Sequence, residues 1–116
     1  MSDAEKKRIF FYYLFVLTIL SVVPGGSASE PVPGTDKILH FTFYLVLAVL
    51  FFHSELLIKF KKELLIILIS STMFGFFIEC IQALIPWRSF EMKDMAANFS
   101  GALSGVFIGR FFLKRN

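Results

Sequence analysis

The sequence predicts an all-α integral membrane protein, a bundle of four transmembrane helices. The first reason is composition, since 56% of the 116 residues are hydrophobic and only 18% are charged, whereas soluble domains are about 45–50% apolar. The second is that the apolar residues form four long runs, close to the length of about 20 residues that a membrane-crossing helix needs. The third is that Lys and Arg flank these runs. The net charge of +3 does not indicate nucleic-acid binding, because a nucleic-acid-binding domain would gather its basic residues on one soluble face. The positions of the basic residues instead indicate the topology of the helices in the membrane.

The four predicted spans belong to one domain, residues 1–116, and cover about residues 9–24, 38–58, 64–85 and 95–113. The first span is short and is followed by small residues at 24–29 that resemble a signal-peptide cleavage site. We expect a retained helix instead, because Tyr12 and Tyr13 together with snorkelling Lys and Arg side chains lengthen the span. Cleavage would leave the topology of the later spans unchanged.

The basic residues predict that both ends of the chain lie in the cytoplasm. Nine of the twelve Lys and Arg residues lie before the first span, between the second and third spans, or at the end of the fourth. By the positive-inside rule these segments are cytoplasmic, whereas residues 24–37 and 86–95 face outward. Pro86 stops the third span and Trp87 suits the membrane interface. The third and fourth helices should therefore form a tight outer hairpin.

Ionisable residues inside a span are costly, about 2.5–3.5 kcal/mol at its centre, yet the three later spans carry several at the same outer level. Asp36, His40 and Tyr44 are spaced i, i+4, i+8 and share one helical face. Glu79 comes late in the third span and Asp94 opens the fourth. We therefore expect these helix ends to converge on one outer-face site. The predicted catalytic residues are His40, Glu79, Asp36 and Asp94, and the predicted substrate-binding residues are Arg88, Gln82, Asn98 and Tyr44.

The leading functional hypothesis is that this site binds a lipid-linked or cell-envelope substrate. Arg88 offers a planar fork of donors that suits a phosphate or a carboxylate. His40 beside Glu79 or Asp36 suits proton transfer. Two versions of the hypothesis differ in whether the substrate is only bound or is also modified. Membrane lipids are expected partners and nucleic acid is not.

Structural explanations compete with this hypothesis. Asp36 and Asp94 are typical of helix N-caps, where a carboxylate meets free N–H groups and the positive end of the dipole. Glu79, Gln82 and Asn98 are typical of interhelical hydrogen bonds, worth about 0.6 kcal/mol each. Groups that serve only as such contacts would be scattered in depth, whereas these share one membrane level. That common level favours a functional site.

Glycines at positions 101, 105 and 109 form a stripe along the fourth span and predict a close-packing surface, not a phosphate loop. We expect Gly101, Gly105 and Gly109 to contact another helix. The stripe also supports an alternative function, a non-enzymatic accessory or scaffold protein. In that case the fourth helix docks a partner membrane protein or a second copy of the chain.

Metal chemistry is a weaker alternative. One His with carboxylates, at His40, Glu79, Asp36 and Asp94, is an undistinguished ligand set, and no close-spaced His or Cys motif supports it. The sequence therefore predicts no metal ion and no cofactor.

Other polar side chains in the spans have ordinary explanations. Cys80 lies in an apolar run and is expected to be a small buried hydrophobe instead of a reactive thiol. His53 and Glu55, near the cytoplasmic end of the second span, are expected to be solvated at the interface. None of the three is a predicted site residue.

Taken together, the polar residues and glycines resemble the pattern of the VanZ-like family of membrane proteins. The resemblance covers the chain from residue 36 to residue 109. It rests on Asp36-Lys37-x-x-His40-Phe41-x-x-Tyr44, Glu79-x-x-Gln82, Pro86-x-Arg88 and Asp94-x3-Asn98-x2-Gly101-x3-Gly105. It implies a multi-pass protein of the bacterial cytoplasmic membrane. The founding member of that family is associated with low-level resistance to the glycopeptide antibiotic teicoplanin.

Overall fold

The computed structural model describes residues 2–22, 35–85 and 92–113, which contain four α-helices. They are α1 (Asp3–Val22), α2 (Thr35–Ser54), α3 (Glu63–Ala83) and α4 (Met92–Phe112). The prediction of an all-α chain with four helices is confirmed. Each helix has 20 or 21 residues and is about 30 Å long at a rise of 1.5 Å per residue. That length matches the hydrocarbon thickness of a bilayer.

Local signals explain why two helix boundaries differ from the predicted spans. α1 begins at Asp3, earlier than predicted, because Ser2 and Glu5 form a capping box. The Ser2 backbone N–H donates to Glu5 Oε1, and the Glu5 N–H donates to Ser2 Oγ, both at 3.2 Å. α2 ends at Ser54 because the next residue, Glu55, has a φ of 61°, which is incompatible with a right-handed helix.

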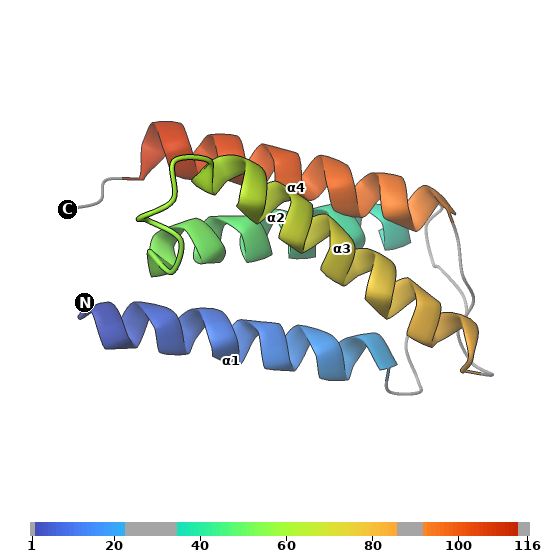
Figure 1. Cartoon of the computed structure of the whole chain (residues 1–116). Helices are drawn as coiled ribbons and strands as arrows, with labels where there is room; N and C mark the ends of the chain where they lie inside the picture. Colours follow the sequence, from blue (N-terminus) through green and yellow to red (C-terminus); the bar gives the residue numbers. More distant parts are fainter. Residues whose placement is uncertain (1, 23–34, 86–91, 114–116) are drawn as a thin grey trace.

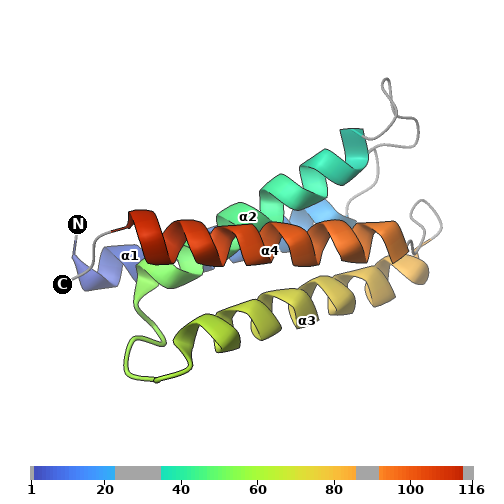
Figure 2. The same cartoon turned by 90° about the horizontal axis from the view of Figure 1, so that it is seen from above.

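The helices run alternately in opposite directions and pack lengthwise (Figure 1). The start of α1, the end of α4 and the connection between α2 and α3 lie together, on the left of Figure 1. The start of α2, the end of α3 and the start of α4 lie at the opposite end of the bundle (Figures 1 and 2). The molecule measures 44 × 23 × 23 Å. The helix ends that carry the predicted site residues therefore share one end of an elongated bundle.

α4 packs most extensively against α2, and glycines make this contact close. A Cβ atom at Gly101 would lie 2.2 Å from the carbonyl oxygen of Phe41, and one at Gly105 would lie 2.4 Å from that of Leu45. Only a residue without a Cβ atom lets two helix backbones approach so closely. The glycines therefore determine how α4 is set against α2.

α1 covers the other side of α2 through aromatic and polar contacts. The rings of Phe10 and Phe51 stack with their centroids 4.6 Å apart. The Tyr13 hydroxyl donates a hydrogen bond of 2.6 Å to the carbonyl oxygen of Phe43. α1 is thus part of the packed bundle and shares a core cluster with α2.

The bundle exposes apolar side chains and buries polar ones, the reverse of a soluble helical protein. Tyr12, Phe77 and Phe111 are 72%, 61% and 67% exposed, whereas Glu79 and Asn98 are 0% and 1% exposed. Within the described residues, α2 over Lys37–Ser54 and α3 over Glu63–Ala83 are long and apolar enough to cross a membrane. α1 opens with a charged segment and α4 carries charged and amide side chains, which makes both less apolar. Four membrane crossings and their orientation stay predictions.

Candidate functional site

The start of α2, the end of α3 and the start of α4 lie at one end of the bundle (Figure 2), and they carry five polar residues whose side chains lie close together. We call them the polar end cluster; they are Lys37, His40, Glu79, Asp94 and Asn98. Antiparallel packing explains the convergence, because the first turns of α2 and α4 then lie beside the last turns of α3. The helix spacing in the sequence places these side chains on the inward faces.

His40 stands at the centre of the cluster. Its Nδ1 atom is 3.0 Å from Asn98 Oδ1, and its Nε2 atom is 3.6 Å from Asp94 Oδ2. The His40 side chain is 20% exposed, so the ring connects the buried groups to the surface of the molecule. Asn98, which is 1% exposed, orients the ring from α4.

Asp94 forms an ion pair with Lys37, whose Nζ atom is 2.7 Å from Asp94 Oδ1. The Asp94 side chain is buried, and it lies in the first turn of α4, where the helix dipole favours a carboxylate. Asp94 is the third residue of α4 as the structure describes it, and its role in capping the helix stays a prediction. Its two oxygens contact Lys37 and His40.

Glu79 is the most completely buried acid among the described residues, with 0% exposure. One of its oxygens, one oxygen of Asp94 and one nitrogen of His40 all lie within 4.8 Å of one another. The prediction that these three residues converge therefore agrees with their positions in the fold. Three helices each contribute one member, so the geometry depends on the whole bundle.

Two other predicted site residues have different surroundings. Tyr44 lies one helical turn below His40 and is 3% exposed, and a Cβ atom at Gly75 would meet both its ring and the Asn98 amide. Gln82 is directed away from the cluster, since its side-chain amide donates a 2.7 Å hydrogen bond to the carbonyl oxygen of Ser21 on α1. Tyr44 thus packs one turn below the cluster, and the hydrogen bond of Gln82 links α3 to α1.

Part of the predicted site lies outside the described residues. This applies to the side chain of Asp36, to Arg88, and to residues 86–91 of the tight hairpin predicted between α3 and α4. The predicted roles of Asp36 and Arg88 therefore stay predictions.

Some contacts were missed by the sequence interpretation. The pairing of Lys37 with Asp94 was not predicted, although Lys37 and His40 at i, i+3 share a helical face. Glu55 was expected to be solvated, but its carboxylate forms a largely buried ion pair with Lys6, with 2.5 Å between Oε1 and Nζ. Cys80 was expected to be buried but is exposed on the surface of α3, because its position faces away from the other helices.

The three glycines of α4 pack against α2 of the same chain. All three are buried, and a Cβ atom at Gly109 would lie 2.9 Å from the ring of Phe52 on α2. Gly101 and Gly105 face α2 in the same way. The stripe is therefore occupied by α2 and does not offer a free docking face in this structure.

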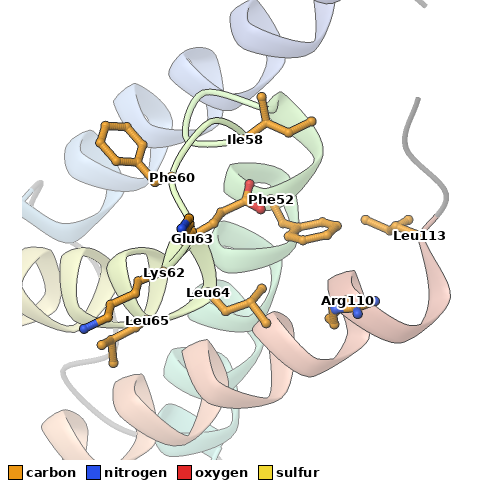
Figure 3. Close-up of a pocket in the computed structure, with 10 residues that line it drawn as sticks. Phe52, Ile58, Phe60, Lys62, Glu63, Leu64, Leu65, Arg110 and Leu113 are labelled. Atoms are coloured by element: carbon orange, nitrogen blue, oxygen red, sulfur yellow. The ribbon is translucent and has the colours of Figure 1, made fainter.

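A separate pocket of about 750 Å³ lies at the other end of the bundle, around the α2–α3 connection (Figure 3). Its walls are apolar apart from Lys61, Lys62, Glu63 and Arg110. It contains none of the predicted site residues, so the cavity and the polar end cluster are distinct features.

Comparison with known protein families shows which family the chain belongs to. The model of the VanZ/LLP1 family matches residues 4–113, from the first helix to the last described residue. The chain belongs to the VanZ/LLP1 family. This VanZ/LLP1 chain is also 28% identical to "Uncharacterized protein C11E3.10" of Schizosaccharomyces pombe, over 112 residues that are 97% of this chain and 68% of the relative. No solved structure matches it.

The Schizosaccharomyces pombe relative affects how the predicted location in a bacterial membrane is judged. Because it comes from a yeast, membership of the VanZ/LLP1 family does not by itself place a chain in a bacterial membrane. The family assignment agrees with the resemblance drawn from the polar residues and glycines.

Proposed function

We propose that this VanZ/LLP1 chain is a multi-pass membrane protein whose polar end cluster binds the headgroup of a lipid-linked or cell-envelope substrate at the outer membrane face. One observation carries the proposal. An imidazole, two carboxylates and an ammonium group from three helices are gathered at one end of an otherwise apolar bundle. Ionisable groups in such a position are costly and are usually retained for function.

Membrane insertion is supported by the surface of the molecule. Exposed aromatic and aliphatic side chains are spread over all four helices, and exposed apolar surface of this extent would make a soluble protein aggregate. A bilayer solvates such a surface without cost. Two of the helices meet the length and composition needed for crossing.

The outward orientation of the cluster is supported by the distribution of basic residues. At the opposite end of the bundle are Lys6, Lys7, Arg8, Lys59, Lys61, Lys62 and Arg110. The positive-inside rule assigns that end to the cytoplasm. The polar end cluster then lies at the outer headgroup level, where a lipid-linked substrate presents its polar part.

The chemistry of the cluster suits both binding and proton transfer. Lys37 offers a cation to an anionic group, and its exposed part reaches the surface. His40, positioned by Asn98 and adjacent to Asp94, is the group best suited to accept or deliver a proton. In the version of the proposal in which the substrate is modified, His40 acts as the general base and Asp94 stabilises its protonated form.

The scaffold alternative has less support. Its motivating feature was the glycine stripe of α4, and that stripe packs on α2 of the same chain. A scaffold would therefore have to use a different surface. The finer proposal is that the substrate is a cell-envelope precursor, in keeping with the association of the founding VanZ-like member with teicoplanin resistance.

The proposal predicts that lipid captured from the membrane depends on the polar end cluster. The chain is purified in a mild detergent, and co-purified lipid is identified and counted by native mass spectrometry. His40→Ala and Glu79→Gln should each lower the captured amount about tenfold, because losing one hydrogen bond to a charged group costs about 1.5–3 kcal/mol.

The chain provides matched controls for this experiment. His53→Ala removes the other histidine, at the far end of α2, and Glu63→Gln neutralises a buried glutamate at the far end of α3. Both should capture lipid as the wild type does. Equal loss in the controls, or equal loss of membrane abundance in every variant, would favour a purely structural cluster. Teicoplanin susceptibility of expressing cells is a second readout, specific to the envelope-precursor version.

A further inference from the structure

The tautomer of His40 can be deduced from its contacts. Asn98 Oδ1 is an amide oxygen and can only accept a hydrogen bond, so His40 Nδ1 carries the proton and donates it across 3.0 Å. In the neutral ring, Nε2 then presents a lone pair. That lone pair is directed toward Asp94 Oδ2, another acceptor, 3.6 Å away. This distance exceeds the range of a hydrogen bond between the two atoms.

A separation of 3.6 Å also fits two ligands of one metal ion. Two ligand atoms bound at about 2.0–2.2 Å to a tetrahedral ion lie roughly 3.3–3.6 Å apart. An oxygen of Glu79 completes a set of three ligand atoms within 4.8 Å of one another. Three atoms at this spacing reach the separations of ligands on one ion once they approach one another by roughly 1 Å.

Two of the three residues are also held by an outer partner, as in known metal sites. A histidine that binds a metal normally donates its second ring N–H to an outer acceptor, and a ligating carboxylate is normally held at its second oxygen. Asn98 plays the first role for His40, and Lys37 plays the second for Asp94, at 2.7 Å from Oδ1. Outer partners of the kind that a metal site needs are thus present for two of the three residues.

We propose that His40 Nε2, Asp94 Oδ2 and one carboxylate oxygen of Glu79 bind a divalent first-row transition-metal ion, with Zn²⁺ as the reference. One imidazole with two carboxylates is a ligand set that such ions accept. Three protein ligands leave a fourth position for water or for an oxygen of a substrate. The inference revises the sequence prediction of no metal. It stands on the geometry independently of the proposed headgroup binding, and it replaces the version in which His40 is the general base, because a metal-bound Nε2 does not accept a proton.

The ion would also change the charge of the cluster. With both carboxylates ionised, Lys37 leaves one negative charge among the described side chains of the cluster. A divalent cation reverses that sign. A bound ion would therefore act together with Lys37 in attracting a phosphate or carboxylate group to the polar end cluster.

Zn²⁺ binding by the full-length chain tests the proposal. The protein is purified with a tag that lacks histidine, stripped with EDTA and titrated with Zn²⁺, and bound metal is measured by mass spectrometry and calorimetry. We expect one Zn²⁺ per chain. His40→Ala and Asp94→Asn should abolish stoichiometric binding, whereas Asn98→Ala keeps all three ligands and should weaken it by about 10–100-fold.

Controls separate the site from adventitious binding and from misfolding. His53→Ala and Glu63→Gln should bind one Zn²⁺ like the wild type. Co²⁺ added to the wild type should give the visible absorption of a tetrahedral site, which needs no variant to fold. A wild type that binds no stoichiometric Zn²⁺, or binding that His40→Ala leaves unchanged, would overturn the inference.

The two proposals fail separately. Zn²⁺ uptake without lipid capture keeps the metal site and overturns the proposed function. If the chain takes up no Zn²⁺ but captures lipid whether or not EDTA is present, the metal site is overturned and the proposed function is kept.

Discussion

Glu55 shows how a single residue can be strained and useful at the same time. Its φ of 61° lies in the left-handed region, which costs a residue with a Cβ atom about 1–2 kcal/mol. The carboxylate forms a 2.5 Å ion pair with Lys6, and the side chains are 12% and 13% exposed. Lys7 adds a hydrogen bond to the carbonyl oxygen of Ser54. The turn after α2 is thereby tied to the first turns of α1.

This geometry predicts an order of stability for two variants. Glu55→Ala and Glu55→Gly both remove the ion pair with Lys6, but only glycine relieves the left-handed backbone. Glu55→Gly should therefore be more stable than Glu55→Ala, by about 1 kcal/mol. Thermal unfolding of the purified proteins in detergent measures the difference. Equal stability, or a more stable alanine variant, would show that the backbone at this position is not strained.

At the residue scale, much of the polar end cluster could be predicted from helical spacing. His40, Glu79, Asp94 and Asn98 each lie on a polar face at the same end of a helix, and antiparallel packing then brings those ends together. The partner of Gln82 could not be predicted, because spacing gives the face of a helix but not the neighbour that it meets. The role of Lys37 was missed because a lysine at a helix end has a ready explanation as an interfacial anchor.

At the element scale, the contact between α2 and α4 sets the position of the cluster. The three glycines of α4 do not contribute equally, because their neighbours differ. A Cβ atom at Gly101 would meet the backbone oxygen of Phe41 at 2.2 Å, whereas one at Gly109 would meet the movable ring of Phe52 at 2.9 Å. A backbone cannot move aside without shifting the helix, but a ring can rotate.

This difference predicts unequal effects of the same substitution. Gly109→Ala should cost about 1 kcal/mol or less, since overpacking is partly offset by the better helix propensity of alanine. Gly101→Ala should cost about 3 kcal/mol, the upper end of overpacking penalties, and it should also weaken lipid capture by displacing Asn98. Unfolding temperatures and captured lipid check both variants. A milder effect at Gly101 than at Gly109 would contradict the observed packing.

The helices themselves could be predicted from the sequence to different degrees. The apolar runs indicated all four, because each is long enough to stand out from its polar flanks. The start of α1 was placed too late because the capping box of Ser2 and Glu5 lies outside the apolar run. The end of α2 was placed too late because the left-handed turn falls on Glu55, a residue type that does not signal it.

At the scale of the whole molecule, the account depends on where the two ends of the bundle lie. One end carries the polar end cluster, and the other carries most of the basic residues and the pocket of about 750 Å³. If the bundle spans a membrane as proposed, the cluster faces outward and the basic end faces the cytoplasm. A substrate from the cell envelope could then reach the cluster without crossing the membrane.

Chemical labelling of single cysteines tests this central claim most directly. Cys80 is exposed and is first replaced by serine. Lys93→Cys then marks the cluster end and Lys61→Cys marks the opposite end, both at exposed positions. In intact expressing cells, a membrane-impermeant maleimide should label Lys93→Cys, and it should label Lys61→Cys only after permeabilisation. Labelling of Lys61→Cys alone, or equal protection of both positions in intact cells, would contradict an outward-facing site.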